Sequence, residues 1–128
     1  MTKVIWKDEP DDHDYPAAQA YLSLLASDAE VTRLVAQLKT APLVHQKAKD
    51  ILRAARLQLL PADNPHVASD LQKIKDDKGL SPVLLVGGDL ANGRALQVAD
   101  GYHRVCAGYH TDENTDVPCR LVPPVQSH

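Results

Sequence analysis

The sequence predicts an α+β fold, in which a small mixed sheet with helices is preceded by an N-terminal helical segment. Apolar residues recur at helical spacing up to about residue 56, and short β-rich runs separated by turn residues follow from residue 57. No Gly/Ser linker separates the two parts, and 128 residues is an ordinary size for one hydrophobic core. We therefore expect a single domain, 1–128, made of a helical extension (1–56) and a core (57–122).

Three helices are expected in the first part of the chain. Pro16 suits a first helical turn, and the apolar residues of 17–25 keep helical spacing. Ser27 and Glu30 have the form of a capping box, which predicts a second helix directly after them. A third helix is expected over 40–57, because its apolar residues mark one face.

A short strand and a fourth helix are expected next. Residues 57–60 alternate between apolar and polar side chains, as a strand does. Asn64 then supplies a helix cap and Pro65 a first helical residue. Gly79 is placed to end this helix in the left-handed conformation.

A hairpin and a last strand complete the expected sheet. Residues 82–86 form an apolar, β-rich run, and 95–98 alternate again after the turn residues Asn92 and Gly93. Residues 117–122 predict one more short strand. A short helix is expected between the hairpin and this strand, after Gly101.

Charge and composition exclude several classes of partner. Fourteen Lys and Arg against seventeen Asp and Glu give a net charge of −3, so no global positive field favours nucleic acid. No apolar run approaches the length of a membrane span, and we expect a cytoplasmic protein without a membrane partner. The cysteines Cys106 and Cys119 have no metal or disulfide spacing, and Cys106 is interpreted as a buried structural residue.

The segment around Gly101 is the best candidate for chemistry. Where a strand gives way through a glycine to a helix, the first helical amides lack intrahelical partners and attract an anion. Gly101 would let the ligand approach closely. His103 and Arg104 in the first turn would add donors suited to phosphate oxygens.

Two neighbours of this turn leave alternatives open. Asp100 is either a base or a ligand for a cation beside phosphate, or a residue that stabilises the turn through its side chain. Tyr102 either stacks on a base or lies half-buried with its hydroxyl in water. The acidic runs 8–14 and 110–116 follow no known metal-ligand spacing, so both are interpreted as solvated loops and no metal site is predicted.

The order of elements over about 57–122, together with Asp100-Gly101-Tyr102-His103-Arg104, resembles the ParB/sulfiredoxin superfamily. The resemblance implies that Gly101, His103 and Arg104 hold the phosphates of ATP or another nucleotide, with Mg²⁺ as a further expectation. Ser69 matches a phosphate-contacting serine of sulfiredoxins, whereas His66 stands where those proteins have a lysine.

Departures from the superfamily pattern shape the functional prediction. Sulfiredoxins carry their nucleophilic cysteine where this chain has Tyr102, so their thiolate chemistry is not expected. The chain also lacks the Arg-rich turn of CTP-hydrolysing partition proteins. The expected function is binding of a nucleotide or phosphate, with phosphoryl transfer or hydrolysis served by Asp100 and His103.

Two other interpretations remain open at this point. One is a non-catalytic binding or regulatory module with a vestigial phosphate site, whose helices in 1–56 form a surface for a protein partner or a homodimer. The other is a ParB-like nuclease, against which the acidic charge balance counts.

Overall fold

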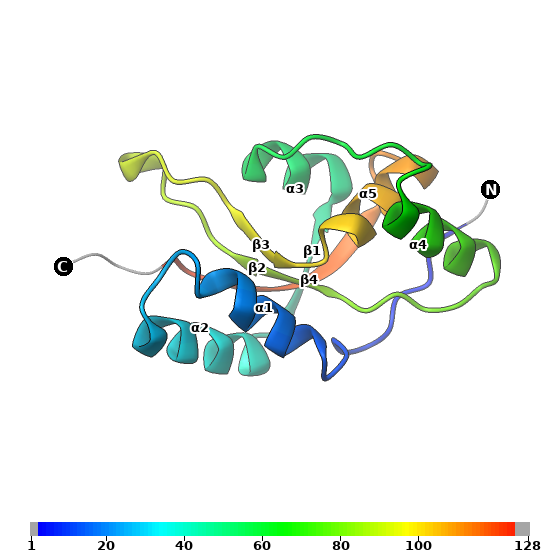
Figure 1. The fold of residues 1–128 in the computed structure, drawn as a ribbon. Helices are drawn as coiled ribbons and strands as arrows, with labels where there is room; N and C mark the ends of the chain where they lie inside the picture. The colour runs from blue at the N-terminus through cyan, green and yellow to red at the C-terminus, as the bar shows by residue number, and fades with distance from the viewer. Residues whose placement is uncertain (1–2, 125–128) are drawn as a thin grey trace.

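The structure, a computed structural model, describes residues 3–124 and is an α+β fold with a four-stranded mixed sheet (Figure 1). The helices are α1 (Asp14–Leu22), α2 (Asp28–Thr40), α3 (Ala48–Ala55), α4 (Pro65–Lys75) and α5 (Tyr102–Thr111), with a 3₁₀ turn, η1 (Leu90–Asn92). The strands are β1 (Leu43–Lys47), β2 (Val83–Val86), β3 (Gln97–Asp100) and β4 (Asp116–Val122).

The sheet has the strand order β1-β4-β2-β3. β2 is parallel to β4, whereas β1 pairs with β4 and β3 pairs with β2 in antiparallel fashion. All four residues of β2 are buried, which explains why its sequence is apolar without alternation. The predicted strand at 82–86, its hairpin with the next strand and the last strand are confirmed.

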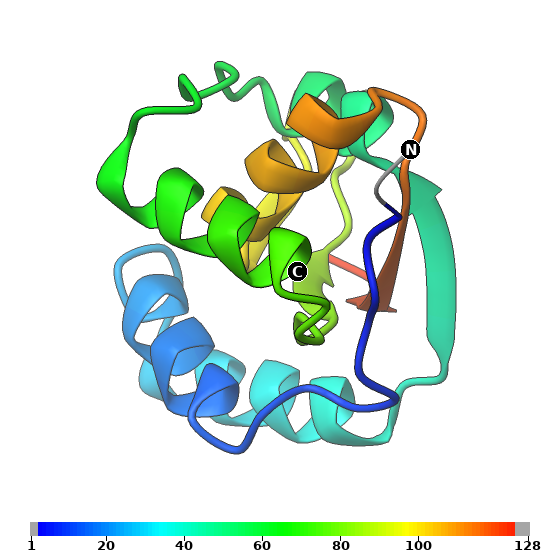
Figure 2. The ribbon, with the colours of Figure 1, turned by 90° about the vertical axis from the view of Figure 1, so that its right-hand side faces the viewer.

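Helices cover both faces of the sheet, as Figures 1 and 2 show. On one face, α1 and α2 pack against alternate residues of the central strands, including Leu84 and Val86 of β2. On the other face, α3, α4 and α5 pack against Val83 and Leu85 of the same strand. Successive residues of β2 thus serve two separate hydrophobic clusters, because side chains of a strand point alternately to opposite faces.

The predicted helix starts are confirmed by their caps. The Ser27 hydroxyl accepts a hydrogen bond from the Glu30 amide at 3.3 Å, at the start of α2. The Asn64 side chain accepts from the amides of His66 and Val67 at 3.0 and 3.2 Å, and Pro65 is the first residue of α4. These signals lie within a few residues of one another, so local sequence suffices to specify them.

The prediction of one helix over 40–57 is wrong in its first part. Residues 43–47 form β1, and only 48–55 are helical. Leu43 and Val44 lie opposite Arg120 and Cys119 of β4, so pairing with a distant strand overrides the local helical pattern. Residues 1–56 therefore contribute an edge strand to the sheet, in addition to a helical layer.

The strand predicted at 57–60 is also wrong, because no neighbouring strand pairs with this segment among the described residues. Two of its carbonyl groups are held by side chains of α5 instead. The Tyr102 hydroxyl donates to the Gln58 carbonyl at 2.6 Å, and His110 Nε2 lies 2.7 Å from the Leu60 carbonyl oxygen.

Gly79 does not terminate the fourth helix as predicted. α4 ends at Lys75, and the left-handed residue beyond it is Asp77, with φ +56°. Gly79 instead lies against the N-terminal segment: a Cβ atom there would be 3.2 Å from Lys7 Cγ. The small residue thus lets residues 5–7 run beside Leu80, where Trp6 and Leu80 form a parallel bridge.

Within residues 3–124, no helix is both long and apolar enough to cross a membrane.

Substitution of Gly101 tests the packing between the start of α5 and the sheet. Gly101 has φ +112°, and an added Cβ would lie 2.4 Å from Val83 Cγ1 and 2.8 Å from Val83 Cβ. Because backbone strain and overpacking add, we expect Gly101→Ala to lower the free energy of unfolding by about 2–5 kcal/mol in urea denaturation.

Gly93→Ala is the matched control, because Gly93 has φ +68° but no atom within 4 Å of the added Cβ. It should cost only the backbone term, about 1–2 kcal/mol. Equal losses in the two variants would show that Val83 makes room for the new methyl group.

Candidate functional site

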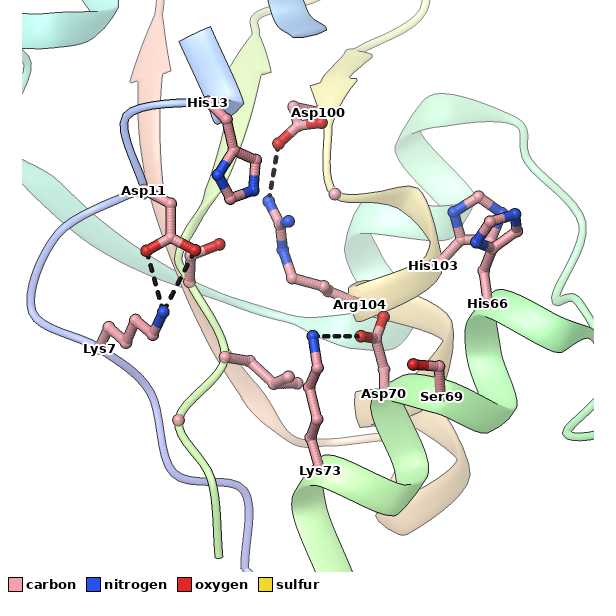
Figure 3. A pocket seen from close by; sticks show the side chains of 14 residues that line it. Lys7, Asp11, His13, His66, Ser69, Asp70, Lys73, Asp100, His103 and Arg104 are labelled. Atoms are coloured by element: carbon pink, nitrogen blue, oxygen red, sulfur yellow. Dashed lines mark hydrogen bonds and ion pairs between the residues drawn. The ribbon is translucent and has the colours of Figure 1, made fainter.

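A polar cavity of about 300 Å³ lies between the N-terminal segment, α4 and the start of α5 (Figure 3). Its lining includes three histidines, three permanently basic side chains and three carboxylates: His13, His66, His103, Lys7, Lys73, Arg104, Asp11, Asp70 and Asp100. A larger hollow, of about 820 Å³, is lined by two carboxylates and only one lysine, near the end of α5. Of these two cavities, only the first brings several basic side chains together with histidines.

The N-terminal segment forms one wall because it is held beside Leu80. The Lys7 amide donates to the Leu80 carbonyl at 2.8 Å, and the Leu80 amide donates to the Ile5 carbonyl at 2.9 Å. Lys7 Nζ lies 2.9 Å from Asp11 Oδ1, on the opposite side of the cavity from α4 in Figure 3. Residues near the start of the chain thus reach a site built largely from its second half.

One face of α4 forms the facing wall. His66, Ser69, Asp70 and Lys73 are spaced so that they share this face, and all four line the cavity. Lys73 Nζ lies 3.9 Å from Asp70 Oδ1. The side chain of Lys73 is half exposed, so its ammonium group remains accessible to a ligand.

The first turn of α5 forms the floor and brings helix amides to the cavity. Gly101 precedes α5 with a left-handed backbone, and His103 and Arg104 follow in the first turn. The amides of this turn have no intrahelical acceptor and carry the positive end of the helix dipole. Only glycine fits at position 101, because a Cβ atom there would collide with the Val83 side chain.

Arg104 is held by two carboxylates. Its Nη2 donates to Asp100 Oδ2 at 3.0 Å and to the Pro82 carbonyl at 3.3 Å, while Nη1 lies 3.7 Å from Asp14 Oδ1. The side chain of Asp14 is only 2% exposed. The guanidinium group therefore compensates a buried charge, and its buried Nε has no hydrogen-bond partner in the protein.

Asp14 is further held by polar neighbours. The Ser81 hydroxyl donates to Asp14 Oδ2 at 2.8 Å, and the Asp11 amide donates to the same oxygen at 3.0 Å. Asp100 is less completely satisfied: burial raises its pKa, and the adjacent Asp14 carboxylate raises it further, whereas Arg104 lowers it. Two carboxylates thus share one guanidinium group, and Asp100 is the member that takes up a proton more readily than a free aspartate.

His103 and His66 form a ring pair on the rim. Their ring centroids are 4.7 Å apart, and the His103 centroid is 5.7 Å from that of Tyr102. Burial lowers the pKa of His103, as does the neighbouring His66, while Asp70 opposes them. Burial raises the pKa of Asp70. His103 is thus biased towards the neutral imidazole, which can accept a proton.

The structure brings five of the six predicted site residues to this cavity: Ser69, Asp100, Gly101, His103 and Arg104. Tyr102 is not among the lining residues. Its ring packs against the core on the α3–α5 side of the sheet, and its hydroxyl donates to Gln58 instead of lying in water. Cys106 and Cys119 are fully buried, which confirms the structural interpretation of Cys106.

Sequence reasoning missed several lining residues. Lys73 could have been found, because it follows Ser69 by one helical turn and shares its face. Lys7 and Asp11 could not, because their place depends on pairing with Leu80, more than 70 positions away.

The interpretation of 8–14 as a solvated acidic run is wrong for Asp14, which is 1% exposed. Among the described residues, Asp11, His13 and Asp14 bring potential metal-ligand atoms within 4.8 Å of one another. However, Lys7 already pairs with Asp11, and Arg104 and Ser81 contact Asp14. These internal partners satisfy the carboxylates without an ion.

Comparison with known proteins adds no relative: no family model, no curated protein and no solved structure matches the chain.

Removing the Arg104 guanidinium group tests its structural role. Arg104→Gln leaves Asp14 buried without a counter-charge, so we expect the free energy of unfolding to fall by about 3–5 kcal/mol in urea denaturation. Arg53→Gln, which removes an 85% exposed arginine near Asp50, should change it by less than about 0.5 kcal/mol.

A second substitution distinguishes lost charge compensation from lost packing. Adding Asp14→Asn to Arg104→Gln removes the uncompensated charge and should restore part of the lost stability. No recovery in the double variant would contradict the electrostatic explanation.

Proposed function

We propose that this chain binds a phosphate group in the cavity between α4 and α5. The observation that carries the proposal is the convergence of Ser69 and Lys73 on one helix face with the free amides of the first turn of α5. A hydroxyl donor, an accessible ammonium group and a helix amino end are the groups that recognise phosphate oxygens.

In the proposed site, the lining residues have different roles in binding the phosphate. Lys73 and Ser69 contact the phosphate directly, and the α5 amides face its remaining oxygens. His66 and His103 add imidazole donors at the rim. Arg104 holds the floor in place through Asp14 and Asp100, and contributes to the ligand mainly through its long-range charge.

We also propose that residues of about 57–122 are arranged in the manner of the ParB/sulfiredoxin superfamily. The support is their order: a helix, a hairpin of two strands, a helix and a last strand, with the Asp-Gly-Tyr-His-Arg segment at the start of α5. A nucleotide with Mg²⁺ is the ligand that this resemblance implies. The apolar faces of α1 and α2 pack on the sheet, so a surface for a protein partner or a homodimer would use the exposed residues of these helices.

Phosphate binding can be measured by thermal unfolding and calorimetric titration with inorganic phosphate. At about 100 times the dissociation constant, the ligand should stabilise the native state by about 2.7 kcal/mol. Ser69→Ala and Lys73→Gln each remove a hydrogen-bond donor to the phosphate. A hydrogen bond to a charged group contributes about 1.5–3 kcal/mol, so we expect each substitution to weaken phosphate binding by roughly tenfold or more.

Lys75→Gln is the matched control, because Lys75 lies on the same helix but outside this cavity. The Lys75→Gln variant should bind phosphate with the same affinity as the wild type. These variants are sharper than Arg104→Ala, in which loss of the ligand contact and loss of the Asp14 partner coincide. No stabilisation of the folded wild type by any phosphate compound would overturn the proposal.

Hydrolysis or transfer of the bound phosphoryl group is a second candidate function. The observation in its favour is that His103 lines the cavity, and burial lowers the pKa of its imidazole, which favours the neutral form that a general base needs. A non-catalytic binding module is the alternative.

Release of phosphate from ATP and from a small phosphomonoester, with and without Mg²⁺, tests this function. The rate should rise with pH as His103 loses its proton, with a midpoint below the ordinary histidine value of about 6.5. His103→Gln should abolish release, whereas phosphate binding should be retained because the Gln amide still supplies an N–H donor. Absence of any release from a wild type that binds phosphate would favour the non-catalytic module.

A further inference from the structure

The cavity that holds the proposed phosphate site is polar almost throughout. Leu80 is the one lining residue with an apolar side chain in the part of the chain that the structure describes. Sites for larger organic ligands are lined predominantly by apolar and aromatic side chains, and occupy roughly 300–1,000 Å³. At about 300 Å³, this cavity is at the small end of that range and lacks such a lining.

Among the described residues, no Phe, Tyr or Trp side chain lines the cavity. Tyr102, the nearest candidate in sequence, hydrogen-bonds to Gln58 and does not line the cavity. The His103 ring already lies against the rings of both His66 and Tyr102. A base that stacked on His103 would compete with these two rings, and would therefore gain little of the stacking energy that usually favours it.

Carboxylates line the cavity beside the phosphate donors. The side chains of Asp11, Asp70 and Asp100 are 31%, 14% and 19% exposed, so each keeps some contact with the cavity. An ionised carboxylate only accepts hydrogen bonds, so the group opposite it must be a donor. Hydroxyl groups meet this requirement and fit a small polar space.

We propose that the ligand is a small phosphomonoester of a polyol or sugar, bound by its phosphate at Ser69 and Lys73 and by its hydroxyl groups at the carboxylates. The ligand carries no nucleobase. This inference rests on the proposed phosphate site and narrows its ligand class.

Titration with ribose 5-phosphate, AMP and inorganic phosphate tests the inference on the intact chain. Ribose 5-phosphate should bind at least tenfold more tightly than inorganic phosphate, because it adds hydroxyl donors. AMP, which adds a base to the same sugar phosphate, should bind no more tightly than ribose 5-phosphate.

The outcomes separate this inference from the proposed function. Tighter binding of AMP than of ribose 5-phosphate would overturn the inference and leave the phosphate site intact. Equal binding of ribose 5-phosphate and inorganic phosphate would also overturn it. No binding of any of the three compounds would instead overturn the proposed function itself.

A variant of Asp70 tests the role of the carboxylates. Asp70→Asn should reduce the advantage of ribose 5-phosphate over inorganic phosphate, since an amide is a poorer acceptor, whereas Asp63→Asn, an exposed control ahead of α4, should preserve it. The readout is the ratio of the affinity for ribose 5-phosphate to the affinity for inorganic phosphate. A change that affects only the binding of the phosphate group alters both affinities equally and leaves this ratio unchanged. An unchanged ratio in Asp70→Asn would contradict the assignment of Asp70.

Discussion

The buried charge of Asp14 requires a partner, and Arg104 supplies it across 90 positions of sequence. Transfer of an isolated carboxylate into a protein interior costs several kcal/mol, so α1 can start at Asp14 only where the guanidinium group and the Ser81 hydroxyl are already present. Arg104 also binds Asp100 and the Pro82 carbonyl. The Arg104 side chain of α5 thus contacts the start of α1, the end of β3 and the residue before β2.

This constraint bears on the proposed phosphate site. Arg104 faces the cavity but already pairs with Asp14 and Asp100, so the proposal assigns the direct contacts to less constrained groups: the half-exposed Lys73, the Ser69 hydroxyl and the amides at the start of α5. Lys73 and Lys7 are paired with carboxylates over the cavity. A bound phosphate would compete with Asp70 for Lys73, whereas a hydroxyl group would complement Asp70. A phosphomonoester with hydroxyl groups can use both kinds of contact at once.

The two-sided cover of the sheet explains why the site lies where it does. β2 is buried on both faces, which leaves the ends of the strands as the places where polar groups can meet water. Gly101 follows β3 and packs directly on Val83 at the start of β2, so the first turn of α5 lies close to the sheet. The N-terminal segment closes this end by pairing with Leu80.

The sequence by itself determined the caps at Ser27 and Asn64, the apolar central strand and the glycine turn between Asp100 and α5, because each depends on residues close together in the chain. Five of the six expected site residues accordingly reach one cavity. Only the tertiary structure decided that 43–47 pair as a strand, that Asp14 is buried and that Lys7 joins the site. The physical reason is that strand pairing and charge burial depend on partners 65 or more positions away, which local patterns do not encode.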